Sequence, residues 1–238
     1  MQNLEQRGQP TAPPAGPSTG APPALLPAAV AEAIRGACDM LALPPRVPCT
    51  ALTFLRRMPP DELPPQRLAA ACVFLAAKVE EAAVRTNDML NAVAAWQGGP
   101  AAATDAAALS RSPCLVGEAY QAVKRQLILD EQLLLRRLRF EIGVEQPHRH
   151  LYALAHCWGA PAATLRLATC LLNDCVARCP SYGTAAMPPA TAAAAALHLG
   201  GQLCGQQVQP HGWWRAAGIT DPALAATCAT LLDMLAAA

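Results

Sequence analysis

Side chains that could catalyse a reaction are sparse in this chain of 238 residues. Adjacent acidic residues occur at 61–62, 80–81 and 130–131. Neighbouring residues on a helix point in different directions, so none of these pairs is suited to acid–base catalysis by two matched carboxylates. A glycine-rich phosphate loop and an HExxH metal motif are both absent from the sequence. The sequence therefore predicts no catalytic residue and no enzyme.

Cysteine and histidine residues between positions 148 and 179 could be metal ligands. The candidates are Cys170, Cys175 and Cys179, with His148, His150, His156 and Cys157 upstream. No CxxC pair occurs in the sequence, whereas a structural zinc ion needs a closed set of four ligands. Small thiols are also common in alanine-rich cores. We therefore expect no metal and no other cofactor. Because residues 1–9 do not form a signal peptide, we also expect free thiols in a reducing compartment.

Two charged residues stand out because they lie on apolar helix stripes. Lys78 follows Phe74 by four residues, and Glu131 lies four residues after Leu127 and four before Leu135. That spacing places each charge on the apolar face of its helix. A charge on such a face is costly unless it is paired or meets a partner. Both residues are therefore candidates for a binding interface.

The choice of lysine at position 78 is unusual in this chain. Only Lys78 and Lys124 are lysines, against sixteen arginines. A lysine in so arginine-rich a sequence suggests a site that needs a compact ammonium rather than a planar guanidinium. The alternative is that the side chains of Lys78 and Glu131 simply extend to the surface.

Prolines divide the chain into the elements that must position these residues. Proline fits the first turn of a helix and ends the helix before it, and most prolines here precede an apolar, alanine-rich stretch. This pattern predicts helices at 27–42, 46–58, 65–82, 86–96, 115–139, 147–158, 161–178, 188–204 and 222–236, with a short helix around Trp213 and Trp214. No stretch of alternating apolar and polar residues predicts a strand.

These helices form two sets of five, so the predicted fold is all-α, with two tandem five-helix bundles. Residues 68–79 and 190–203, in the third helix of each set, are apolar nearly all round and should be central. The predicted domains are 27–143 and 144–238. They follow a disordered tail at 1–26 that is rich in proline, glycine and alanine.

Composition excludes two classes of partner. The net charge is +1, which argues against a nucleic-acid binder that works through a broad basic surface. Mean hydropathy is +0.20, but no apolar run approaches the ~20 residues that a membrane helix needs. Of the 35 formal charges, 29 fall in residues 1–150. A protein partner that needs polar contacts should therefore meet the first bundle.

Several stretches of the chain resemble the cyclin family. Residues 68–81, which end in AAKVEE, and the following RTND at 85–88 resemble the third helix and next turn of a cyclin box. EQLLLRRLRF at 131–140 resembles the end of its fifth helix. The AAKVEE…RT.D form is typical of the transcription-associated cyclins of types K, L, T and Q. QPHRHL at 146–151 resembles the start of their second box, and HGWWR at 211–215 resembles a late element of the Q type.

The resemblance implies a regulatory subunit that binds and activates a cyclin-dependent kinase of the transcription-related class. In the family, the residues matching Lys78 and Glu131 contact the kinase near its mobile αC helix. The cyclin holds that helix inward and so completes the kinase's own Lys–Glu ion pair. The predicted kinase-binding residues are Lys78, Glu131, Phe74, Glu80, Glu81 and Arg85. A nuclear protein is implied, with the cytoplasm as a second location.

Two other functions remain open at this point. One is a cyclin-fold transcription factor, as in general transcription factor IIB, which would need a basic face for DNA. Residues 151–238 contain only three arginines and no lysine, which argues against it. The other is a helical scaffold that has lost kinase binding, and the presence of both Lys78 and Glu131 argues against that.

Overall fold

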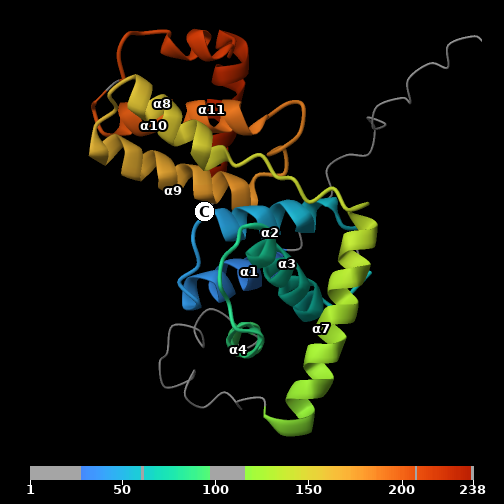
Figure 1. The fold of residues 1–238 in the computed structure, drawn as a ribbon. Helices are drawn as coiled ribbons and strands as arrows, with labels where there is room; N and C mark the ends of the chain where they lie inside the picture. Colours follow the sequence, from blue (N-terminus) through green and yellow to red (C-terminus); the bar gives the residue numbers. More distant parts are fainter. Residues whose placement is uncertain (1–27, 60–61, 97–115, 207, 237–238) are drawn as a thin grey trace, which may run out of the picture.

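The computed structural model describes residues 28–59, 62–96, 116–206 and 208–236. Within them the chain is helical, and the ten elements form two successive groups of five (Figure 1). The first group contains α1 (Ala28–Met40), α2 (Arg46–Arg57), α3 (Pro65–Val79), α4 (Thr86–Trp96) and α7 (Gly117–Arg137). The second contains α8 (Pro147–Cys157), α9 (Ala162–Arg178), α10 (Pro189–Leu203), the 3-10 helix η1 (Trp213–Ala217) and α11 (Asp221–Ala236).

The all-helical prediction is confirmed for the described part of the chain. Each predicted helix is found with bounds within a few residues, and no strand occurs there apart from one isolated bridge between Tyr182 and Met187. Proline stands at the first turn of α3, α8 and α10, where its missing N–H costs no helical hydrogen bond. For these three helices the proline pattern marked the start correctly.

The third helix of each group is central, as predicted. In the first bundle α3 contacts α1, α2, α4 and α7, and in the second α10 contacts α8, α9 and α11. Both helices bury small residues on several faces, alanine above all. Small side chains let the surrounding helices approach closely, so an alanine-rich helix can occupy the middle of each bundle.

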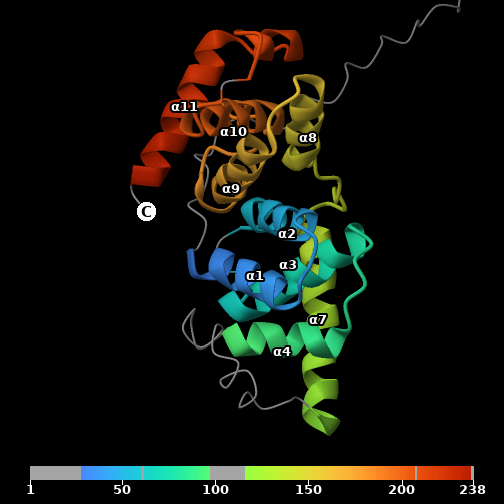
Figure 2. The same ribbon diagram turned by 90° about the vertical axis from the view of Figure 1, so that its left-hand side faces the viewer.

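The two bundles meet where α2 lies against α9 (Figure 2). Arg56 on α2 donates from Nη2 to the carbonyls of Val176 (2.5 Å) and Cys179 (3.1 Å) at the C-terminal end of α9. Its neighbour Arg57 donates to the carbonyl of Glu141 at 2.9 Å, in the segment that leads to α8. A guanidinium suits carbonyls that have no helical partner. These two arginines therefore join α2 to both the second bundle and the connecting segment.

Three further expectations concern boundaries and membrane contact. The boundary predicted at 143/144 lies in the segment between α7 and α8, and the division into domains stays a prediction. The predicted tail at 1–26 lies outside the described residues. None of the helices in the described ranges is long and apolar enough to cross a membrane.

His148, at the start of α8, leads to a prediction about pH. Its Nε2 lies 2.7 Å from Oδ1 of Asn173 on α9, while its Nδ1 is buried without a hydrogen-bond partner in the described structure. Burial lowers the pKa of His148 below its usual value. The unfolded chain therefore binds a proton at His148 more readily than the folded chain does, and the stability that this residue contributes is lost as the pH falls below about 6.5.

We expect His148→Gln, which keeps a donor for Asn173 but does not titrate, to remove this part of the pH dependence. Urea unfolding of both proteins at about pH 7.5 and about pH 5.5 measures it. The wild type should lose more free energy of unfolding between the two pH values than the variant. An equal loss in both proteins would contradict the prediction.

Candidate protein-binding site

Lys78 and Glu131 form an ion pair across the contact between α3 and α7. The Nζ of Lys78 lies 2.7 Å from Oε1 and 2.8 Å from Oε2 of Glu131. The Lys78 side chain is 51% exposed, whereas that of Glu131 is 10% exposed. The alternative in which both side chains extend to the surface therefore holds only for Lys78. Its buried partner, Glu131, fixes where the ammonium lies. Bonds to both carboxylate oxygens use two of its three N–H groups, so one remains for a partner.

The ring of Phe74 also contacts the Lys78 ammonium. It lies one turn before Lys78 on α3, and the Nζ of Lys78 stands 4.0 Å from the centre of its ring. The face of an aromatic ring attracts a cation at this distance. Phe74 itself is half-buried and packs against the core. The ring and the carboxylate together hold one positive charge at a defined place on the surface.

A second ion pair, which the sequence analysis missed, fastens α7 to the start of α3. Asp130 is buried and accepts from Nε of Arg67 at 2.9 Å and from Nε2 of Gln126 at 3.1 Å. The hydrogen bond to Asp130 raises the pKa of Arg67. The sequence did contain a signal for this ion pair, because Asp130 lies on the apolar stripe of its helix. It is three residues after the buried Leu127 and four before the buried Leu134. As expected for neighbours on a helix, Asp130 and Glu131 point to different partners.

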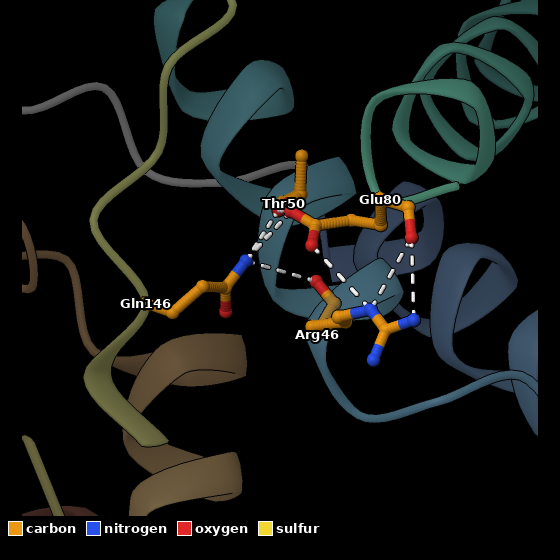
Figure 3. A network of polar contacts seen from close by, with 4 residues as sticks. All are labelled: Arg46, Thr50, Glu80 and Gln146. Atoms are coloured by element: carbon orange, nitrogen blue, oxygen red, sulfur yellow. Dashed lines mark hydrogen bonds and ion pairs between the residues drawn. The ribbon is translucent and has the colours of Figure 1, made fainter. Parts of the chain in front are cut away.

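Glu80, a predicted kinase-binding residue, is engaged inside the molecule (Figure 3). Its Oε1 accepts from the hydroxyl of Thr50 at 2.6 Å and from Nε2 of Gln146 at 2.9 Å. Arg46 lies 3.6 Å from Oε2 and also donates to the main-chain carbonyl of Glu80. The guanidinium offsets the unfavourable position of an acid at a helix C-terminus. The carboxylate therefore connects α2, the end of α3 and the residue before α8.

Glu81 and Arg85 lie in and after the turn that ends α3. The N–H of Ala82 bonds to the carbonyl of Ala77 at 2.8 Å, and Glu81 has φ +53°, which is a left-handed helix end. Both Glu81 and Arg85 are exposed. The structure thus brings Phe74, Lys78 and Glu131 into one cluster and places Glu80 in a separate network. A role in an interface stays a prediction for all six residues.

We expect Glu80→Ala to destabilise the fold by about 1–3 kcal/mol, because it leaves Thr50 and Gln146 without their shared acceptor and Arg46 without its counter-charge. The matched control is Glu81→Ala, which removes an exposed acid from the next position and should change stability by less than about 0.5 kcal/mol. Urea unfolding followed by circular dichroism measures both values. Equal, small effects would contradict the structural role of Glu80.

The candidate metal ligands do not gather at one point in the described structure. No group of three or more histidine, cysteine, aspartate or glutamate residues there could hold a metal ion. Cys175 and Cys179 are buried beside the thioether of Met187, whereas Cys157 and Cys170 are exposed. The cysteines of the described ranges are free thiols. Absence of a cofactor stays a prediction.

Comparison with known proteins gives a structural match only. No family model matches the chain, and no curated protein matches it. A chain in the crystal structure of the yeast RNA Pol II CTD kinase CTDK-1 complex matches with a TM-score of 0.65 and 15% identity over 87% of this chain. A chain in the structure of the CAK complex from Chaetomium thermophilum bound to ATP-gamma-S matches with a TM-score of 0.54 and 19% identity, also over 87%.

Both structural matches agree with the two-bundle fold that the sequence resemblance implies. The chain has a cyclin-like fold. It spans 64% and 61% of the lengths of the two chains that it matches. At such identities the match concerns the arrangement of the helices and says nothing about individual residues of the cyclin-like fold.

Proposed function

We propose that this chain is a cyclin, a regulatory subunit that binds and activates a cyclin-dependent protein kinase. The observation that carries the proposal is the Lys78–Glu131 pair, held across α3 and α7 of a cyclin-like fold. In this proposal the chain supplies binding energy and no catalytic group. By holding the mobile αC helix of the kinase inward, it would complete the Lys–Glu ion pair on which kinase activity depends.

The surface around the pair has the mixed character of a protein interface. Ile128, three residues before Glu131 on α7, is an exposed aliphatic side chain, and Phe74 is half-buried under the ammonium. An aromatic and an aliphatic side chain next to a positioned charge suit a patch that a partner covers. In this proposal Glu81 and Arg85 extend the surface beyond the end of α3. Glu80 would contribute indirectly, by holding the C-terminal end of α3 in place.

We assign the kinase to the transcription-related class and the complex to the nucleus. The sequence resemblance to the transcription-associated cyclins supports this assignment. One of the two structural matches is a chain of a yeast RNA polymerase II CTD kinase complex, which agrees with it. Nucleic acid and membranes are not expected as direct partners, because the net charge is +1 and the second bundle carries few charges.

Capture from nuclear extract, followed by reconstitution, tests the proposal. The full chain is used as bait, and bound kinases are identified by mass spectrometry. Each kinase is then produced with and without the chain and assayed on a peptide from the RNA polymerase II tail. We expect one kinase to bind stoichiometrically and to become active only in the complex. Failure of every captured kinase to gain activity would overturn the proposal.

A further inference from the structure

A cavity of about 410 Å³ lies at the junction of the two bundles. Its walls come from the C-terminal end of α2, the segment before α8, and the loop between α9 and α10. The lining includes Arg56, Arg57, Tyr182, Pro189 and Glu145. None of the predicted kinase-binding residues lines it, so it is a separate feature of the molecule.

Arg56 contributes a positive charge to this cavity, and no carboxylate of the described residues forms an ion pair with it. Its Nη2 bonds to the carbonyls of Val176 and Cys179 at the end of α9, but Nε and Nη1 are buried and have no hydrogen-bond partner in the described structure. Its guanidinium lies 5.2 Å from the centre of the Tyr182 ring. Burial of the cation is unfavourable and lowers the pKa of Arg56. The charge of an anion in the cavity would reduce this cost.

Two further features make the cavity positive. Arg57 lines the same wall, and its bonds in the described structure go to neutral carbonyls. Pro189 brings in the N-terminus of α10, a helix of 15 residues whose dipole favours negative charge there. Glu145, the acid among the described lining residues, is largely exposed and accepts from His150 at 2.6 Å, so it does not form an ion pair with Arg56.

We propose that the cavity is a binding site for a phosphate monoester. Arg56 and Arg57 come from α2, and the α10 N-terminus contributes its dipole from the second bundle, so the cavity is positive on two sides although Pro188 and Pro189 have no N–H to donate. A tetrahedral dianion accepts from several directions and carries enough charge for two arginines, whereas a planar carboxylate uses a single fork. The cavity is larger than one phosphate group, which leaves room for the group that carries it. A ligand here would contact both bundles at once.

Titration of the full chain at fixed ionic strength tests the site and its source of phosphate. The probes are inorganic phosphate, a short phosphoserine peptide and its unphosphorylated twin, with binding measured by calorimetry and by ³¹P NMR. We expect saturable binding with one site per chain. Phosphoserine peptide binding more tightly than inorganic phosphate, with no binding of the twin, would identify a phosphorylated polypeptide. Similar affinity for inorganic phosphate would identify a small phosphate ligand.

Three variants locate the binding. Arg56→Gln should weaken it at least tenfold, since each charge-assisted hydrogen bond lost costs about 1.5–3 kcal/mol. Arg57→Gln, at a more exposed residue, should weaken it by a smaller factor. Arg166→Gln removes an exposed arginine of α9 outside the lining and should have no effect.

Two results would overturn the site: no saturable binding of either phosphate probe to the wild type, or equal affinity in all folded variants. If Arg56→Gln does not fold, the wild type and Arg57→Gln still decide the matter.

Discussion

If the proposed kinase partnership holds, replacing Lys78 with alanine is expected to weaken binding of that kinase by roughly thirty-fold to several thousand-fold. Truncation of a desolvated, paired charge at an interface typically costs about 2–5 kcal/mol, and about 1.4 kcal/mol corresponds to each factor of ten. Glu131→Ala should have an effect of similar size, because it removes the carboxylate that holds the ammonium in place. The double variant should lose less than the sum, since each residue acts through the other.

Folding should respond far less than binding to these changes. The Lys78 side chain is half exposed, so water takes over part of its role when the pair is broken, and we expect a loss of about 1 kcal/mol in the free energy of unfolding. Arg215→Ala is the matched control. It breaks an exposed ion pair with Asp221 in the second bundle and should leave kinase binding unchanged.

The test measures kinase affinity, kinase activation and urea unfolding for the four variants. Together these distinguish a role in the interface from a role in folding alone. The interface assignment is contradicted if the Lys78 and Glu131 variants lose stability but their folded fraction activates the kinase normally. In that case the pair would serve only to join α3 to α7. Glu81→Ala and Arg85→Ala, measured in the same way, would show how far the interface extends past the end of α3.

A leucine at position 200 will destabilise the second bundle by about 3 kcal/mol, the upper end of what overpacking usually costs. Gly200 lies on the buried α10 where it crosses α9. A Cβ at this position would stand 3.0 Å from the carbonyl oxygen of Thr164 and 3.1 Å from the main-chain nitrogen of Ala168. These are backbone atoms of a neighbouring helix, so they cannot move aside as a flexible side chain would.

Urea unfolding also measures this effect. Gln202→Leu places the same side chain two residues along α10, at an exposed position, and should change stability by less than about 0.5 kcal/mol. An unchanged midpoint for Gly200→Leu would mean that α9 and α10 do not pack through Gly200, and would contradict the close crossing of these two helices.

Helix positions were largely predictable because their determinants are local. Proline at a first turn and apolar residues three or four positions apart specify where a helix starts and which face it buries. The same spacing singled out Lys78 and Glu131, since a charge on an apolar stripe is visible without knowing the partner helix. It would equally have revealed Asp130, whose spacing from Leu127 and Leu134 matches that pattern.

Which helices meet, and through which atoms, was decided only by the tertiary structure. Glu80 was predicted at the interface, yet Thr50 lies 30 residues before it and Gln146 66 residues after it in the network that holds its carboxylate. The Arg56 side chain reaches a carbonyl 120 residues away, and the same residue lines a cavity that exists only between the bundles. Periodicity is a property of a few consecutive turns, whereas these contacts depend on how whole helices cross. The amino-acid sequence by itself therefore determined the helices and their buried faces, and packing determined the partners.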